Sequence, residues 1–458
     1  MKILIIGNGV AGTFTAQNIR NLDKDVEIVV ISQEKYPYYT RIKLPELISE
    51  KIKVDDLIVF KEEWYQRNNI KTILNKKVKR IDPKHKYVIV EGESDPITYD
   101  NLVIATGSMP NIPPINNAKE LVGKGVFTLR KIDNAIEIRD YIKNNSVQKA
   151  IIIGGGLLGL ELAKQIKNCD LDTTVVEFFP RLLPRQLDEE SGSLLKEQIE
   201  EMGIKVELDA ATEEIVGNDQ VKGIRIKDGR EFEADLVLIQ AGIRATIDLA
   251  KEAKLEVNRG IIVNQFLETS AENIYAVGDC IEYKNQIWGI IPACIEQSKI
   301  VAASVLGKKT LEYNGTVPKN TLKIMGIDLT SIGMFFPEEQ DQAGADWEIL
   351  KNCDFKGSCY KKIVLKDNKL KGAILFGEKE AIPYITRNID TEINEDELRL
   401  AINLYEWICE GCGSIYDEAK MELLFKHLPE DWKCPKCKGP KSGFKKSNIE
   451  EYNKENEQ

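Results

Sequence analysis

Two short apolar runs, each ending in a glycine-rich turn, stand out in the chain. They cover residues 2–6 and 149–153, and both are mainly aliphatic. Uninterrupted runs of this kind are typical of strands buried on both faces of a parallel sheet. Helical periodicity follows each run, from Thr13 to Asn21 and from Leu160 to Asn168. The repeat predicts an α/β chain with two doubly wound, Rossmann-like units.

Other patterns divide the rest of the chain. Residues 78–90 and 97–104 alternate like strands, with turns at Asp82-Pro83 and near Gly92. The prolines between residues 110 and 114 indicate one domain crossing. A second crossing is expected near Ala241-Gly242, and residues 318–390 read as a mixed α/β segment.

The segment 394–403 predicts a short charged helix, with Asn394 as N-cap and Glu397 at the capping-box position. About ten helical residues would span ~15 Å, so we expect a stiff arm rather than a flexible string. A cysteine-containing module begins at Tyr405, and the polar end of the chain, residues 445–458, is expected to fray.

Composition narrows the function. A chain of 458 residues has room for about three domains. The net charge of −10 argues against nucleic acid or an anionic membrane as the main partner. No apolar stretch approaches the ~20 residues that cross a bilayer, and the first apolar run ends at Gly7 without a cleavage site. A cytoplasmic protein is predicted.

The first glycine-rich turn satisfies G-x-G-x-x-G between a strand and a helix. Its backbone N–H groups and the helix N-terminus can hold a pyrophosphate. Glu34 follows the strand Glu27 to Ile31, where a carboxylate can accept hydrogen bonds from ribose hydroxyls. The binding residues expected here are Gly7, Gly9, Val10, Ala11 and Gly12.

The second turn repeats this pattern, and Glu177 follows its next strand, Thr173 to Val176. A carboxylate at Glu177 favours a free 2′-hydroxyl, so NADH is preferred to NADPH. Arg181 and Arg185 lie close enough in sequence to weaken this preference. The binding residues expected here are Gly154, Gly156, Leu157, Leu158 and Gly159.

With these motifs, residues 1–390 resemble the FAD-dependent pyridine nucleotide-disulfide oxidoreductases. Residues 99–107, the segment from Thr269 to Cys280 and the pair Glu296-Gln297 carry the resemblance. It implies FAD at the first turn and NAD(P)H at the second. The implied domains are 1–114 with 241–316 for FAD, 115–240 for NAD(H), and a small α/β domain at 317–393.

The resemblance also implies roles for single residues. Asp279 would bind the FAD ribitol, Val78 the adenine, and Glu161 would lie near the nicotinamide. Pro292 would open a helix whose N-terminus faces the flavin. Other residues implied around the flavin are Arg41, Lys43, Ala105, Thr106, Gly107, Arg130, Gly242, Gly278, Glu296 and Gln297.

No cysteine precedes Cys169, so the early flavin-domain region has no thiolate nucleophile and thiol chemistry at the flavin is not expected. The other scattered cysteines are expected to be small buried hydrophobes. They are Cys169, Cys280, Cys294, Cys353 and Cys359.

Two C-x-x-C pairs near the C-terminus could supply four sulfurs to a tetrahedral Fe or Zn ion. They consist of Cys409, Cys412, Cys434 and Cys437. Residues 407–417 and 428–437 resemble rubredoxin, which favours one iron ion over zinc. The resemblance implies that the aromatic residues of these segments, with Phe444, pack a small core around the site. Gly413 suits a turn that aims N–H groups at sulfur, whereas Lys438 stands where the second pair would have glycine.

The whole chain resembles NADH:rubredoxin oxidoreductases with a rubredoxin-like domain fused at residues 404–448, after a linker at 394–403 and before a disordered tail at 449–458. Electrons would pass from NADH through FAD to the Fe(Cys)₄ centre and a downstream redox protein, with oxygen, peroxide or superoxide detoxification as an implied role. Two alternatives are an NAD(P)H oxidase or diaphorase with a structural zinc module, and a terminal module that only recruits a partner. The oligomeric state stays open.

Overall fold

The computed structural model describes residues 1–317, 319–324, 326–336, 347–354, 358–421 and 423–447. It divides into two compact units. Unit 1 comprises Met1–Phe178 and Ala210–Thr316, and unit 2 comprises Phe179–Asp209 and Val317–Gln458. The tail expected to be disordered lies outside the described residues. No helix in the described parts of the chain is long and apolar enough to cross a bilayer.

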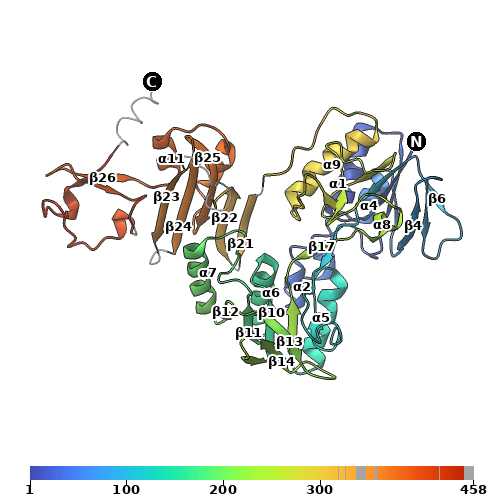
Figure 1. Cartoon of the computed structure of the whole chain (residues 1–458), viewed down its shortest axis with the longest axis horizontal. Helices are drawn as coiled ribbons and strands as arrows, with labels where there is room; N and C mark the ends of the chain where they lie inside the picture. The colour runs from blue at the N-terminus through green and yellow to red at the C-terminus, as the bar shows by residue number, and fades with distance from the viewer. Residues whose placement is uncertain (318, 325, 337–346, 355–357, 422, 448–458) are drawn as a thin grey trace. The chain divides into compact units, whose positions relative to one another are not determined.

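Unit 1 is built first on a five-stranded parallel sheet, ordered β19-β7-β1-β2-β3. Its central strand is buried on both faces, as the aliphatic run predicts, with Ile3, Leu4 and Ile5 fully buried. Helices α1 and α9 pack together beside this sheet (Figure 1). The bounds are β1 Lys2–Ile6, α1 Val10–Leu22, β2 Glu27–Ile31, β3 Ile70–Ile73, β7 Asn101–Ile104, β19 Ile274–Ala276 and α9 Ile291–Val305.

A second parallel sheet in unit 1 contains the strands β11-β10-β16-β9 in that order. The chain enters it after β7 and returns to the first sheet at β19. The α/β class with two Rossmann-like sheets is therefore confirmed. The bounds are β9 Val126–Phe127, α5 Ile132–Asn144, β10 Lys149–Ile153, α6 Leu157–Lys167, β11 Asp172–Val176 and β16 Leu236–Ile239.

Shorter elements complete unit 1. Three antiparallel strands, β4-β5-β6, form one small sheet, and β13-β14-β15 form another. The bounds are α2 Leu44–Ile48, α3 Val54–Leu57, α4 Glu62–Arg67, β4 Val78–Asp82, β5 Tyr87–Val90, β6 Ile97–Thr98, β8 Ser108–Pro110, β13 Thr212–Val216, β14 Gly223–Ile226, β15 Glu231–Glu233, β17 Ile243–Ala245, α8 Asp248–Glu252, β18 Ile261–Ile262 and β20 Ile281–Glu282.

Unit 2 contains an antiparallel sheet ordered β21-β22-β25-β24-β23 and a smaller sheet ordered β27-β26-β28 (Figure 1). Cys409 ends β26 of the second sheet, and the other three terminal cysteines lie outside its strands. The bounds are α7 Glu189–Glu201, β12 Lys205–Glu207, β21 Lys319–Ile324, β22 Ile327–Gly333, β23 Trp347–Asp354, β24 Cys359–Lys366, β25 Lys369–Phe376, α10 Ile382–Asn388, α11 Glu395–Ala401, β26 Glu406–Cys409, β27 Ile415–Asp417, η2 Phe425–His427, η3 Lys441–Gly443 and β28 Phe444–Lys446.

The segment expected to form a stiff arm is instead packed into unit 2. Asn394 caps α11 as predicted, accepting hydrogen bonds from the N–H groups of Asp396 and Glu397. Two of its apolar residues, Leu398 and Ile402, are fully buried, however, although Leu400 is exposed. The two buried residues share one hydrophobic core with the antiparallel sheet of unit 2 and with Ala419 and Leu424 of the cysteine module. The expectation of an arm was wrong, because removing these apolar side chains from water stabilises the packed segment. A solvated spacer would leave them exposed.

Candidate functional site

The first glycine turn is held tightly between β1 and α1. Gly7 has φ +118°, and a Cβ there would lie 2.1 Å from the carbonyl oxygen of Ala105. A Cβ on Gly12 would lie 2.0 Å from the carbonyl oxygen of Gly7. Only glycine therefore fits both positions. Gly9 is the N-cap of α1, so Val10 and Ala11 sit in the helix's first turn, where its N–H groups and positive end favour phosphate.

Glu34 follows β2, as predicted, but its carboxylate is engaged by two neighbours. Its oxygens accept hydrogen bonds from the Tyr39 hydroxyl at 2.5 Å and from Arg41 Nη2 at 2.7 Å. The Arg41 Nε atom is buried without a hydrogen-bond partner among the described residues. This unmatched donor beside the glycine turn is consistent with an anionic or polar ligand there. Burial raises the pKa of Tyr39, so its hydroxyl remains a donor.

Asp279 lies at the centre of a second polar cluster, after β19. Its Oδ2 atom accepts hydrogen bonds from the Ser108 hydroxyl at 2.8 Å and from Arg130 Nη2 at 3.0 Å. Gln297 orients the loop, because its Oε1 atom accepts a 2.8 Å hydrogen bond from the N–H of Gly278. Sequence motifs indicated four of these five residues. Ser108 was missed, since it reaches Asp279 only through the pairing of distant strands.

The remaining residues implied around the flavin are more dispersed. Lys43 is exposed at the start of α2, and Glu296 is exposed on α9, where it accepts a hydrogen bond from Thr316. Neither has a hydrogen bond or ion pair to Asp279 within the described residues. Val78 is buried at the start of β4. Pro292 lies in the first turn of α9, as expected. Of the other residues implied around the flavin, Thr106 donates a hydrogen bond to the Thr246 carbonyl and Ala105 is buried. Gly107 and Gly242 have φ +67° and +87°.

The second glycine turn repeats the first. Gly154 has φ +118°, and a Cβ on Gly159 would lie 2.0 Å from its carbonyl oxygen. Gly156 is the N-cap of α6, and a Cβ there would meet nothing within 4 Å. Glu177 is 6% exposed and accepts a 2.5 Å hydrogen bond from the N–H of Gly155. Leu157 and Leu158 begin α6, and Glu161 follows on the same helix, partly buried.

Arg181 is held by its own segment of chain. Its guanidinium donates hydrogen bonds to the carbonyl oxygens of Pro184 at 3.1 Å and Leu187 at 2.9 Å. Arg185 is exposed. The Nε and Nη2 groups of Arg181 are therefore already engaged in structural contacts and are not free to bind a 2′-phosphate.

Of the five scattered cysteines, two are buried as expected and three are only partly buried. Cys280 and Cys294 are buried, and burial raises the pKa of both thiols. Burial likewise raises the pKa of Cys169 and Cys359, and that of Cys353 to about 12. Thiols with raised pKa values are poor nucleophiles at neutral pH. None of these five is suited to thiol chemistry.

The terminal cysteines lie on two matching turns. In the first, the N–H of Gly413 donates to the carbonyl oxygen of Cys409 at 2.8 Å, and in the second, the N–H of Lys438 donates to that of Cys434 at 2.9 Å. All four Sγ atoms lie within 4.8 Å of one another. The Sγ atoms of Cys409 and Cys437 are 3.6 Å apart, and those of Cys412 and Cys434 are 3.7 Å apart. Metal–sulfur bonds of ~2.3 Å give tetrahedral edges of roughly 3.8 Å, so the set fits one metal ion.

Polar groups lie close to these sulfurs. The Ser414 hydroxyl lies 3.2 Å from Cys412 Sγ and 3.1 Å from Cys434 Sγ. The backbone N–H of Cys437 and this hydroxyl lower the pKa of Cys434 to about 6. Groups that stabilise thiolates also assist metal binding, because the thiolate is the ligand. No sequence motif singled out Ser414.

An aromatic core supports the cysteines, as predicted. Trp407 stacks on Phe425 with ring centroids 4.3 Å apart, and Tyr416, Trp432 and Phe444 surround Phe425. The buried carboxylate of Glu418 accepts hydrogen bonds from the N–H groups of Tyr405 and Phe425 and from Trp407 Nε1, at 2.8, 2.8 and 3.1 Å. These contacts make a compact module around the metal ligands.

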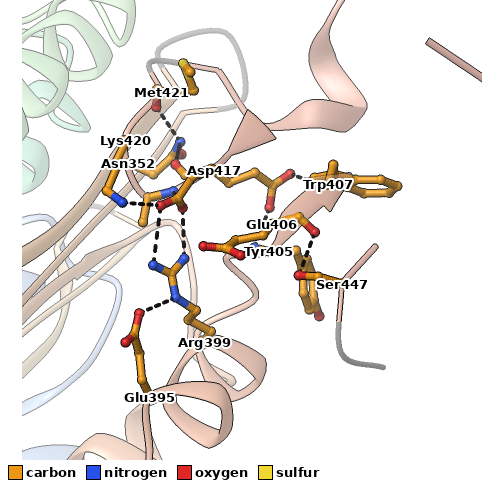
Figure 2. A network of polar contacts seen from close by, with 12 residues as sticks. Asn352, Glu395, Arg399, Tyr405, Glu406, Trp407, Asp417, Lys420, Met421 and Ser447 are labelled. Atoms are coloured by element: carbon orange, nitrogen blue, oxygen red, sulfur yellow. Dashed lines mark hydrogen bonds and ion pairs between the residues drawn. The ribbon is translucent and has the colours of Figure 1, made fainter. Parts of the chain in front are cut away.

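A polar network joins this module to α11 and β23 (Figure 2). Arg399 on α11 binds both oxygens of Asp417, with an Nη1–Oδ1 distance of 2.8 Å, and its Nε atom binds Glu395 at 2.8 Å. Asn352 on β23 donates to the carbonyl oxygens of Glu418 and Met421. Together with the shared hydrophobic core, the network makes the module a fixed part of unit 2.

The chain matches two protein-family models. Residues 1–298 match the pyridine nucleotide-disulphide oxidoreductase family, and residues 318–393 match the rubredoxin NAD⁺ reductase C-terminal domain. The first family implies FAD and NAD(P)H as cofactors. The glycine turns, the unmatched Arg41 donor and the Asp279 cluster fit such ligands.

Several characterised proteins are similar. NADH-rubredoxin oxidoreductase of Clostridium acetobutylicum is 31% identical over 87% of this chain and 96% of its own length. The crystal structure of that enzyme aligns with a TM-score of 0.68 and 30% identity over 88% of this chain and 94% of that one. Nitrite reductase [NAD(P)H] of Bacillus subtilis is 38% identical over 82% of this chain, which spans only 46% of that relative's length.

The chain also spans 48% of the length of the assimilatory nitrate reductase electron transfer subunit of Bacillus subtilis, which is 35% identical over 82% of this chain. The chain belongs to the pyridine nucleotide-disulphide oxidoreductase family.

Proposed function

We propose that the chain is an NADH-dependent flavoprotein oxidoreductase that delivers electrons to an iron ion held by its own four terminal cysteines, and then to a downstream redox protein. The observation that carries the proposal is the pair of matching cysteine turns, with hydroxyl and N–H groups aimed at the sulfurs, in a chain with two nucleotide-binding turns. When bound, FAD accepts a hydride from NADH, and ferric iron accepts single electrons.

The residues of the first domain, 1–114 with 241–316, have roles in holding FAD. The N-terminus of α1 stabilises the pyrophosphate through its N–H groups. Asp279 accepts hydrogen bonds from ligand hydroxyls while Arg130 and Ser108 keep its carboxylate oriented. Gln297 keeps the Gly278 peptide in place.

The second domain, 115–240, selects NADH. Glu177 is buried at the glycine turn, where a carboxylate disfavours a 2′-phosphate. Arg181 is engaged with carbonyl oxygens and does not offset that repulsion freely.

Iron is proposed over zinc because of the sequence around the cysteines. Both ions fit the observed Sγ–Sγ distances. Ser414 and the turn N–H groups supply hydrogen bonds to sulfur. Hydrogen bonds to sulfur stabilise a Zn(Cys)₄ site and a reduced Fe(Cys)₄ site alike, since both carry two negative charges, so the resemblance of residues 407–417 and 428–437 to rubredoxin decides for iron.

An anaerobic titration of the intact protein with NADH tests the proposal. Metal analysis should give one iron per chain, and the iron–thiolate absorbance should bleach together with the flavin absorbance. Cys437→Ser should remove the iron signal while leaving flavin reduction intact. Bound zinc, or iron that NADH does not reduce, would contradict the proposal and favour an NAD(P)H oxidase with a structural zinc module.

If the module only recruits a partner, loss of its metal should not stop reduction of the natural acceptor. Deleting the cysteine module after Asn403 would also test this alternative, but the deletion would expose the hydrophobic core that the module shares with the small domain. Cys437→Ser is therefore the cleaner variant. Reduction of the natural acceptor should be lost in this variant even with partner in excess. Retained reduction would favour recruitment.

We further propose a role in removing oxygen, peroxide or superoxide. Omitting the chain from a reconstituted mixture of NADH and a peroxide- or superoxide-reducing protein should abolish NADH-driven turnover. Unchanged turnover would exclude this role.

A further inference from the structure

The second cysteine turn is strongly basic, although the whole chain has a net charge of −10. From Lys433 to Lys441 the sequence contains four lysines and no acidic residue. Three of them, Lys433, Lys436 and Lys438, are exposed. The fourth, Lys441, is turned back, with its ammonium donating to the Leu428 carbonyl at 2.8 Å.

These lysines surround the most accessible metal ligand. Cys437 is exposed, whereas Cys409 and Cys434 are buried and Cys412 is partly buried. Gly439 flanks its sulfur, since a Cβ there would lie 3.3 Å from Cys437 Sγ. A partner can therefore approach this sulfur closely.

Lys438 occupies its position against backbone preference. Its φ is +63°, in the left-handed region that glycine adopts without strain, and Gly413 fills the matching position of the first turn with φ +72°. The ammonium of Lys438 donates to the Pro435 carbonyl at 3.1 Å, which keeps the charge over the turn. The charge of Lys438 therefore stays beside the turn that carries Cys437.

The rest of the surface around the cysteine turns has few uncompensated negative charges. Glu410 on the first turn is paired with Lys445 at 2.5 Å, and Glu430 lies 3.3 Å from Lys441. Asp431 is an acidic neighbour that has no hydrogen bond or ion pair among the described residues. Ile408 and Ile415 are cross-strand neighbours beside Cys409 and are 36% and 55% exposed. Apolar surface near a ligand and cations at its side form a surface suited to a transient protein contact.

We propose that Lys433, Lys436 and Lys438, around Cys437, form a docking face for an acidic electron-carrier protein. We call this set the lysine face. The inference rests on the proposed function and adds the chemistry of the partner. Each encounter reduces the acceptor by one electron and oxidises the Cys₄ centre by one, with NADH as the reductant that restores it. The local positive field steers an acidic partner despite the negative charge of the whole chain.

The charge of the lysine face can be tested without iron or turnover. Full-length protein labelled with [¹⁵N]lysine and loaded with Zn²⁺ is titrated with the paramagnetic anion hexacyanochromate(III). The amide signals of Lys436 and Lys438 should broaden at least several-fold more than those of Lys420 and Lys426, and added salt should remove the effect. Equal broadening at all four would overturn the proposal, whatever metal the native protein holds.

A second experiment tests docking with two proteins as one-electron acceptors. Acidic plastocyanin should be reduced faster than basic cytochrome c at low salt, and this advantage should shrink as salt is added. The double variant Lys436→Glu/Lys438→Glu should slow plastocyanin reduction about tenfold and accelerate that of cytochrome c. Lys426→Glu is the control, because it makes the same charge change at an exposed lysine outside the lysine face. Its neighbour His427 pairs with Asp354 on β23. An equal effect of Lys426→Glu would overturn the proposal.

The same variants separate an external partner from the flavoprotein part of the chain. In stopped-flow experiments without acceptor, NADH should reduce the Cys₄ centre of the double variant at the wild-type rate. If this step slows and acceptor reduction does not, the lysine face serves the internal transfer and the external docking proposal fails. If NADH reduces no iron in either protein, the proposed function fails while the anion titration still tests the face.

Discussion

The ion pair between Arg399 and Asp417 fixes the cysteine module to α11, and Arg399→Met should loosen it. The two side chains are only 11% and 8% exposed. Removing one partner of a buried ion pair costs roughly 3–5 kcal/mol. Asp417 keeps Lys420 at 2.9 Å and the N–H of Ala419 at 3.0 Å. We therefore expect a loss of about 2 kcal/mol, since methionine also preserves the packing of the side-chain stem.

Thermal unfolding and hydrogen exchange measure this loss. For a folded unit of the size of unit 2, a loss of about 2 kcal/mol lowers the unfolding temperature by roughly 4–8 °C. Amides of β27 and of Ala419 should exchange faster. Glu395→Gln is the matched control, because Glu395 is 53% exposed and its contact with Arg399 is worth about 0.5 kcal/mol. If Arg399→Met is no less stable than Glu395→Gln, the module is not held by this pair.

The pair also predicts acid sensitivity. Burial is the largest single effect on the pKa of Asp417 and raises it, but Arg399, Lys420 and the N–H of Ala419 together lower the pKa below its usual value of 3.8. Its contribution to stability is present above the unfolded pKa and is lost as pH falls through the lower folded value. Attachment of the module should be unchanged between pH 7 and 5 and weaken below about pH 4. In Asp417→Asn this additional acid loss should be absent.

Four further substitutions test the sites. Ser414→Ala removes a hydroxyl from the sulfurs and should lower the reduction potential of the iron-loaded module by about 40 mV, the equivalent of ~1 kcal/mol for one electron; an unchanged potential in spectroelectrochemistry would show that the hydroxyl does not act on the metal. Gly156→Ala meets no atom within 4 Å and should leave stability intact but weaken NADH binding roughly tenfold, whereas Gly154→Ala, with its Cβ 2.5 Å from the Gln240 carbonyl oxygen, should destabilise the fold. Equal melting temperatures of the two glycine variants would contradict this. Lys438→Gly relieves a left-handed backbone and should stabilise the module by about 1 kcal/mol in denaturant unfolding; a loss of stability would mean that the side chain holds the turn.

The sequence was most informative where the physics is local. Aliphatic runs predicted β1, β2 and β10 with their observed bounds. Helices α1 and α6 begin three residues earlier than periodicity indicated, because each starts inside its glycine turn. The C-x-x-C spacing and the neighbouring aromatic residues predicted the cysteine cluster and its core.

Tertiary structure decided how distant residues meet. Ser108 reaches Asp279 across 171 positions of the chain, and no periodicity links them. The charged segment around α11 reads as a solvated arm, but folding buries Leu398 and Ile402 against Ala419 of the module. Spacing and period report only on neighbours along the chain. Contacts that cross from one element to another depend on which surfaces the whole fold brings together to exclude water.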